Sequence, residues 1–116
     1  MAFDLSTLEN GIKLAKLTGR MDMQAVNKVG DQFTLTVGNS QSSAIVDLSE
    51  LTFLASIGMR MLISAARALN HRGHKMVLLS PTPGVKDALV TAGFDELIPI
   101  CDDTDAAIAL LKESVV

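Results

Sequence analysis

One serine stands where a turn of the backbone would let its side chain take part in chemistry. The segment Phe53-Leu54-Ala55-Ser56-Ile57-Gly58 leads from an apolar, extended run into a helix that the spacing of apolar residues predicts from about Ser56 to His71. A helix N-terminus offers unpaired backbone N–H groups and a partial positive charge, which suit a phosphate. Ser56 is therefore predicted either to cap this helix, a role that contributes about 1 kcal/mol, or to accept a phosphoryl group.

Other residue types that could do chemistry do not form a constellation. His71 and His74 fall around a turn with no cysteine or carboxylate at ligand spacing, so we interpret them as solvated turn residues and expect no metal. Asp102 and Asp103 open the last predicted helix and are expected to cap it. Cys101 is interpreted as a small apolar filler. Glycine-rich nucleotide-binding motifs are absent, so we expect no cofactor and no enzymatic activity.

The composition limits the class of partner. The chain has 116 residues, 48% of them apolar, which suits one domain spanning residues 1–116. Its formal net charge is −3, it has no basic run, and it lacks tryptophan and tyrosine, so nucleic acid is not an expected partner. No apolar window is long enough to span a membrane, and no signal peptide is evident. With a single cysteine, these features predict a cytoplasmic protein that binds proteins or small molecules.

The predicted elements alternate along the chain. Strands are expected over 2–8, 12–17, 44–48, 75–79 and 97–100, and helices over 23–37, 56–71, 85–92 and 105–113. Glu9-Asn10-Gly11 favours a hairpin turn, Gly93 ends a helix, and Pro99 indicates a sheet edge. The order predicts an α/β fold: a mixed sheet of about five strands, parallel in the centre with an N-terminal hairpin, packed with about four helices. Loops after the carboxyl ends of parallel strands, including the one before Ser56, are where such folds place their sites.

Three segments resemble a known family. The run from Ala44 to Met59 resembles the signature of STAS domains, the bacterial anti-sigma factor antagonists: an apolar strand, Asp-Leu, then an aromatic residue, Asp-Ser-Ser/Thr-Gly and an apolar helix. Leu17-Thr18-Gly19-Arg20-Met21-Asp22 is similar to the family's Leu-x-Gly-x-apolar-Asp. Residues 80–85 with 91–94 resemble its final helix and the Gly-apolar pair that follows. The resemblance covers essentially the whole chain, in the right order.

The resemblance implies a function in transcription regulation by partner switching. In this family a serine is phosphorylated by a kinase that doubles as an anti-sigma factor; the unphosphorylated domain binds that kinase and frees the sigma factor, and a serine phosphatase resets it. The match implies that Ser56 is the phosphoacceptor and that Asp22 is the acidic residue beside it. Ala55 replaces the family's usual Asp and Ile57 its second Ser or Thr, so the charge and the apolar surface beside Ser56 differ from the family pattern.

Apolar residues at the start of the long helix are expected to be exposed and to anchor a partner. Leu54, Ile57 and Met59 are the candidate anchors, although core positions are the alternative for Leu54 and Met59. Gly58 is expected to leave space for a kinase around the Ser56 hydroxyl. The predicted partner-binding residues are Asp22, Leu54, Ala55, Ile57, Gly58, Met59 and Arg60.

Two other functions are compatible with the same residues. One is an unregulated scaffold that uses this surface constitutively in a signalling complex. The other is a small-ligand or nucleotide sensor that uses the loops near Ser56 and Asp22. Self-association is open as well, so the chain is either a monomer or a weak dimer.

Overall fold

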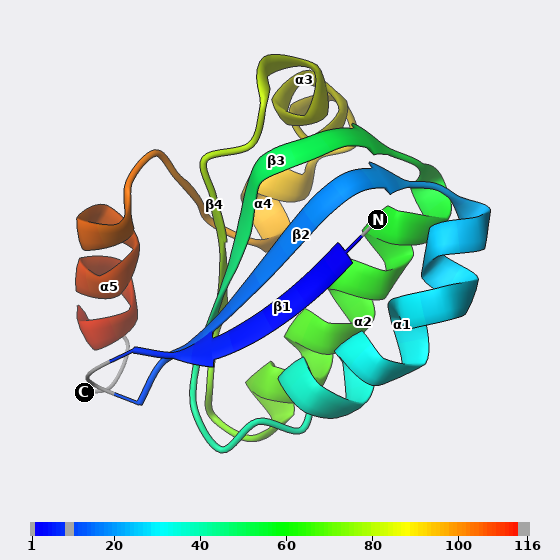
Figure 1. Ribbon diagram of the computed structural model, residues 1–116. Coiled ribbons are helices and arrows are strands. Elements are labelled where there is room, and N and C mark those ends of the chain that lie inside the picture. The colour runs from blue at the N-terminus through cyan, green and yellow to red at the C-terminus, as the bar shows by residue number, and fades with distance from the viewer. Residues whose placement is uncertain (1, 9–10, 114–116) are drawn as a thin grey trace.

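The computed structural model describes residues 2–8 and 11–113, which form one five-stranded sheet with helices on both faces (Figure 1). The strands lie across the sheet in chain order: β1 (Ala2–Thr7), β2 (Lys13–Met21), β3 (Ala44–Leu54), β4 (Met76–Leu79) and β5 (Ile100–Cys101). β1 is antiparallel to β2, and every other pair is parallel. The predicted mixed sheet, with its parallel centre and N-terminal hairpin, is therefore confirmed.

The hairpin between β1 and β2 is closed by the residues around its turn. The Leu8 N–H donates to the Ile12 carbonyl at 2.8 Å, and Gly11 has a φ of 81°, which suits glycine. Glu9 and Asn10, which belong to the predicted turn, lie outside the described residues.

Within residues 2–8 and 11–113, five helices connect or follow the strands: α1 (Met23–Val37), α2 (Ser56–His71), α3 (Pro83–Thr91), α4 (Phe94–Leu97) and α5 (Thr104–Glu113). α4 is additional to the four predicted helices. Gly93 ends α3 in the left-handed conformation, as predicted, with a φ of 79°, but its carbonyl then accepts from the Glu96 N–H and starts another turn. Leu97 was predicted in a strand and instead lies in α4, so β5 begins only at Ile100. β5 forms the sheet edge that Pro99 indicated.

β2 and β3 run further than the alternation of apolar residues predicts. β2 continues past Leu17 to Met21, and β3 continues past Leu48 to Leu54. Their parallel pairing persists through two register shifts, and Gly19 has a φ of 87° beside the second one. The loss of alternation therefore marks irregularities within the strands. As a consequence, the two strands end together.

The sheet separates two apolar cores. In Figure 1, α1 and α2 cover one face and α5 lies against the other. The larger core, on the α1 and α2 side, includes Leu17, Phe33, Val46, Leu48, Leu62 and Leu78. The smaller core, under α5, consists of Ile12, Ile45, Val77, Leu79, Ala107 and Leu111. Because neighbouring residues of β3 and β4 alternate between these cores, residues 44–48 form the buried central strand that the sequence predicts.

An exposed ion pair connects β2 and β3. Lys16 on β2 forms an ion pair with Glu50 on β3. The hydrogen bond to Glu50, followed by the charge of that carboxylate, raises the pKa of Lys16.

Across the described residues, no helix combines the length and the apolar character needed to cross a bilayer.

Candidate functional site

The carboxyl ends of β2 and β3 bring two chain segments side by side. Met21 and Leu54 are register partners, and the Ala55 N–H donates to the Met21 carbonyl at 2.9 Å. The next residues along each segment are Asp22 and Ser56. α1 and α2 therefore begin at the same edge of the sheet, which is the candidate site (Figure 1).

Ser56 lies in the first turn of α2 and does not cap it. Ala55 occupies the N-cap position, with an extended backbone at φ −81° and ψ 165°, and provides no side-chain hydrogen bond. The prediction that Ser56 is the cap is therefore wrong, because the helix already includes Ser56. The Ser56 side chain is exposed, and its hydroxyl has no hydrogen-bond partner within the described part of the chain. The hydroxyl is thus available to another molecule.

Asp22 caps the neighbouring helix. Its Oδ1 accepts a hydrogen bond from the Ala25 N–H at 3.0 Å at the start of α1, while its Oδ2 lies 4.0 Å from Arg20 Nε. The carboxylate is half-buried and faces the same edge as Ser56. Asp22 thus combines a structural role with a negative charge at the candidate site.

Gly58 faces the core. A Cβ atom at this position would clash with Met21 Cγ and would lie 2.8 Å from Leu54 Cδ1. The expectation that Gly58 clears space around the Ser56 hydroxyl is therefore wrong, since positions two apart lie on opposite sides of a helix. The missing side chain instead lets the first turn of α2 pack closely onto the ends of β2 and β3.

The predicted docking residues divide into core and surface. Leu54 is only 6% exposed and lies in the main core, so the expectation of an exposed anchor is wrong there. Its pairing with the buried Met21 directs it inward. Met59 is half-buried and packs against the same core. Ile57 is half-buried and Arg60 is exposed, so these two remain on the surface near Ser56.

Sequence reasoning missed three surface residues at this edge. Phe53 is 39% exposed, and the guanidinium of Arg20 lies 4.4 Å from the centroid of its ring, within cation–π range. Met23, which follows Asp22, is 64% exposed. Arg20 and Phe53 are register partners of β2 and β3. The aromatic residue of the family signature, Phe53, was the available signal. Its partner Arg20 can be identified only once β2 is known to extend past Gly19 and to pair there with the end of β3.

Other polar residues singled out in the sequence lie away from this edge or have structural roles. Asp103 Oδ1 accepts from the Ala106 N–H at 2.7 Å, which confirms the predicted cap of α5. Cys101 packs against the smaller core, and burial, followed by the charges of Asp102 and Asp103, raises the pKa of its thiol. Among the described residues, no three histidine, cysteine or acidic side chains come together as a metal site.

Two surface grooves flank α1 near the site. One, of about 320 Å³, lies between α1 and α2 and includes Ile57 and Arg60. The other, of about 280 Å³, includes Arg20, Asp22 and Lys28. Ser56 lines neither groove. Its hydroxyl is presented on the surface, where a second protein could reach it.

Comparison with known proteins agrees with the resemblance seen in the sequence. The STAS domain model matches residues 6–107. The chain is 23% identical to BtrV of Bordetella bronchiseptica over 106 residues, 91% of each chain. It is 25% identical to the anti-sigma F factor antagonist of Paenibacillus polymyxa over 103 residues, 88% of each.

Solved structures of the anti-sigma factor antagonist SpoIIAA share the fold. The unphosphorylated form matches with a TM-score of 0.79 and 20% identity over 97% of both chains. The phosphorylated form from Bacillus matches with a TM-score of 0.70 and 19% identity over 94% of this chain and 99% of that one. The chain therefore belongs to the STAS domain family.

Proposed function

We propose that this protein is a phospho-regulated anti-sigma factor antagonist that works by partner switching. With Ser56 unphosphorylated, it binds an anti-sigma factor that is also a serine kinase, and so frees a sigma factor. Phosphorylation of Ser56 releases the kinase, and a serine phosphatase restores the first state. In this proposal the protein is a cytoplasmic binding switch without enzymatic activity, and neither nucleic acid nor membrane is a partner.

The observation that carries the proposal is the exposed, unbonded hydroxyl of Ser56 in the first turn of α2. Because Ala55 provides no cap, the first backbone N–H groups of this helix have no side-chain acceptor. A phosphate on Ser56 would lie near these donors and near the positive end of the helix dipole. The domain can therefore accept the modification without unfolding.

The surroundings of Ser56 favour an effect on binding over an effect on stability. A phosphate brings about 1.5–2 negative charges at neutral pH. Ile57, Phe53 and Met23 provide apolar surface at this edge, and a partner packed on such surface would be strongly affected by that charge. Gly58 and Leu54 lie on the core side and would not be exposed to it.

Phosphorylation is tested by incubating the protein with ATP and each anti-sigma factor kinase from the same organism. We expect a mass increase of one phosphoryl group, mapped to Ser56 by peptide mass spectrometry. Ser56→Ala should abolish it, while Ser64→Ala, at another exposed serine of α2, should leave it unchanged. A kinase that binds the protein and leaves Ser56 unmodified would contradict the phosphorylation step.

Binding is tested separately by calorimetry with the same kinase. Ser56→Ala should bind like the wild type, whereas Ser56→Asp should bind more weakly while its circular dichroism spectrum stays native. Equal affinity for all three proteins would replace the switch with a constitutive scaffold. A thermal shift with nucleotides, in the absence of a partner protein, would favour a ligand sensor instead.

A further inference from the structure

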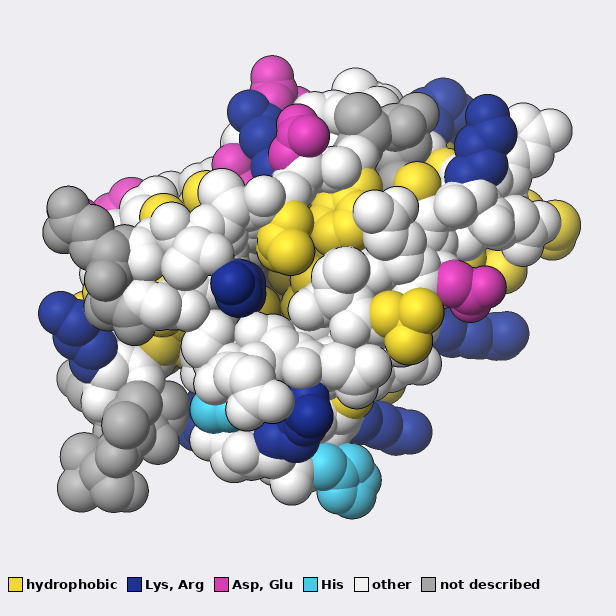
Figure 2. All heavy atoms as spheres, turned by 60° about the horizontal axis from the view of Figure 1, so that its bottom comes forward, with side chains coloured by type: hydrophobic (Ala, Val, Ile, Leu, Met, Phe, Trp, Pro, Cys, Tyr) yellow, Lys and Arg dark blue, Asp and Glu magenta, His cyan; other side chains and the backbone are white. Residues whose placement is uncertain are grey.

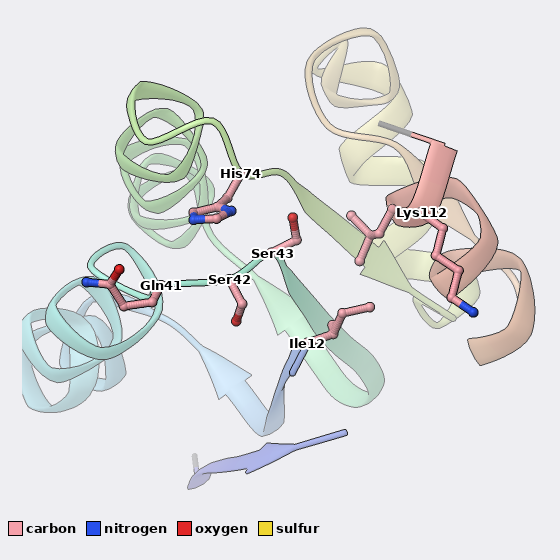
Figure 3. A pocket seen from close by; sticks show the side chains of 7 residues that line it. Ile12, Gln41, Ser42, Ser43, His74 and Lys112 are labelled. Carbon is pink, nitrogen blue, oxygen red and sulfur yellow. The ribbon is translucent and has the colours of Figure 1, made fainter. Parts of the chain in front are cut away.

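A cavity of about 240 Å³ lies at the end of the molecule opposite Ser56, at the amino ends of the parallel strands (Figure 3). Its walls come from the segments before β2, β3 and β4 and from the last turn of α5. The lining residues are Ile12, Gln41, Ser42, Ser43, His74, Leu111 and Lys112. The proposed switch uses none of them.

The base of the cavity is apolar. Ile12 and Leu111 are 7% and 2% exposed and belong to the smaller core between the sheet and α5. In Figure 3, the side chain of Ile12 extends from the start of β2 toward α5. A ligand in the cavity would therefore touch both the sheet and α5.

The polar groups of the cavity favour an anion. Ser43 Oγ accepts from the Lys75 N–H at 3.0 Å, which leaves its own hydrogen free to donate. Within the described residues, the side chains of His74 and Lys112 form no hydrogen bond or ion pair, and no carboxylate lines the cavity. Figure 3 shows the Ser43 hydroxyl between His74 and α5.

The surface around the cavity also carries basic side chains. Figure 2, in which the lower end of Figure 1 comes forward, shows histidine and several lysine or arginine side chains on this end of the molecule. Arg72 and Lys75 are exposed in the segment between α2 and β4. These two residues add positive charge near the cavity.

Size and polarity together limit the ligand. At about 30 Å³ for each water-sized group, the cavity holds about eight non-hydrogen atoms. Pockets for drug-sized ligands measure about 300–1,000 Å³, so a nucleotide needs more room than this cavity offers. Inorganic phosphate would use the donors but not the apolar base. A short-chain carboxylate uses both.

We propose that this cavity binds a short aliphatic carboxylate of about the size of hexanoate. The carboxylate accepts from Ser43 and His74, with Lys112 adding positive charge at the rim. The chain lies on Ile12 and Leu111 and so connects α5 to the sheet. The proposal is independent of phosphorylation at Ser56.

The test is a ¹⁵N-HSQC titration of the full chain with hexanoate. We expect saturable shift changes at residues 41–43, 74 and 111–112, and none at Ser56. Acetate lacks the chain and hexan-1-ol lacks the charge, so both should bind more weakly. Unsaturable or scattered changes, or equal binding of hexan-1-ol or of inorganic phosphate, would overturn the proposal.

Charge-reversal variants identify the site. Lys112→Glu should weaken hexanoate binding by up to about fivefold, the size expected for an exposed ion pair. Lys86→Glu changes the net charge equally on α3, outside the cavity, and should leave binding unchanged. Both lysines are exposed, so both variants should keep the fold. Equal affinity of the two variants for hexanoate would place the ligand elsewhere.

Discussion

Two helices begin side by side at the carboxyl edge of the sheet, and they begin differently. α1 has a side-chain cap, because the Asp22 carboxylate accepts from the Ala25 N–H at 3.0 Å. α2 has Ala55 at the same position and no side-chain cap. Both helices present the same array of unpaired backbone donors at their starts. Of these two helices, α2 is the one whose array is left without a side-chain acceptor.

The two helix starts therefore differ in role. The cap of α1 stabilises the fold, and the uncapped start of α2 is left for the proposed regulation. At the capped start of α1, the Asp22 carboxylate already engages one backbone donor and adds a negative charge, and both disfavour a further anion. An uncapped start next to an exposed serine keeps donors for a phosphate, at a cost in stability while the serine is unmodified. The proposed switch therefore relies on a helix start that is stabilised from the core side, by the packing at Gly58, and not by a cap.

The largest expected effect comes from breaking this packing. Gly58→Ala should lower the free energy of unfolding by about 2 kcal/mol, because overpacking of this kind costs about 1–3 kcal/mol and the new Cβ would clash with Met21. Urea denaturation measures it. Gly84→Ala on α3 is the matched control: a Cβ there meets nothing within 4 Å, so it should be neutral or stabilising by up to about 1 kcal/mol. Equal effects of both would show that Gly58 does not set the position of α2.

The next largest effect is expected from removing the cap of α1. Asp22→Ala should destabilise the protein by about 1 kcal/mol and speed hydrogen exchange at the Ala25 amide. Asp22→Asn keeps an acceptor and should lose much less. If alanine and asparagine were equally destabilising, the charge beside Arg20 would matter more than the hydrogen bond to Ala25.

The reverse change makes α2 resemble α1. Ala55→Asp supplies the missing cap and should stabilise the unphosphorylated protein by about 1 kcal/mol, measured as a raised urea midpoint. Ala55→Ser, a neutral cap, is its control and should stabilise by a similar amount. A destabilised Ala55→Asp variant would show that the α2 start cannot receive a carboxylate.

The smallest expected effect comes from adding a charge at the start of α2, which tests the interaction with the helix dipole alone. Ser56→Asp places a negative charge in the first turn of α2 and should raise the free energy of unfolding by about 0.3–1 kcal/mol at low salt. Added salt should diminish the gain, since the position is exposed. A gain that persists at high salt would indicate a direct hydrogen bond in place of a field effect.

Most of the fold could be predicted from periodicity. The apolar spacing identified α1 and α2 with their observed bounds, and the run 44–48 identified the central strand. The extension of β2 and β3 could not be predicted in this way, because Gly19 and the register shifts interrupt the alternation while the pairing continues. α4 was missed because four residues are too few to establish a helical period.

At the candidate site, sequence reasoning found the serine and misjudged its surroundings. The position of Ser56 followed from the helix pattern, but a shift of one residue at the helix start decides whether it is the cap. Leu54 looked like a surface anchor because its inward direction depends on pairing with Met21, which is a contact between strands. The stacking of Arg20 on Phe53 depends on the same pairing. The local pattern of apolar and polar residues does not reveal such contacts between strands.

The strand order has a consequence for how the chain matures during synthesis. Each strand pairs with the one made just before it, so the sheet can grow as residues emerge from the ribosome. α5, however, is made after all five strands, and it supplies Ala107 and Leu111 to the smaller core. Until then, Ile45 and Val77 present an apolar face to solvent. A nascent chain that stalls before α5 would therefore be prone to aggregate, even with its sheet complete.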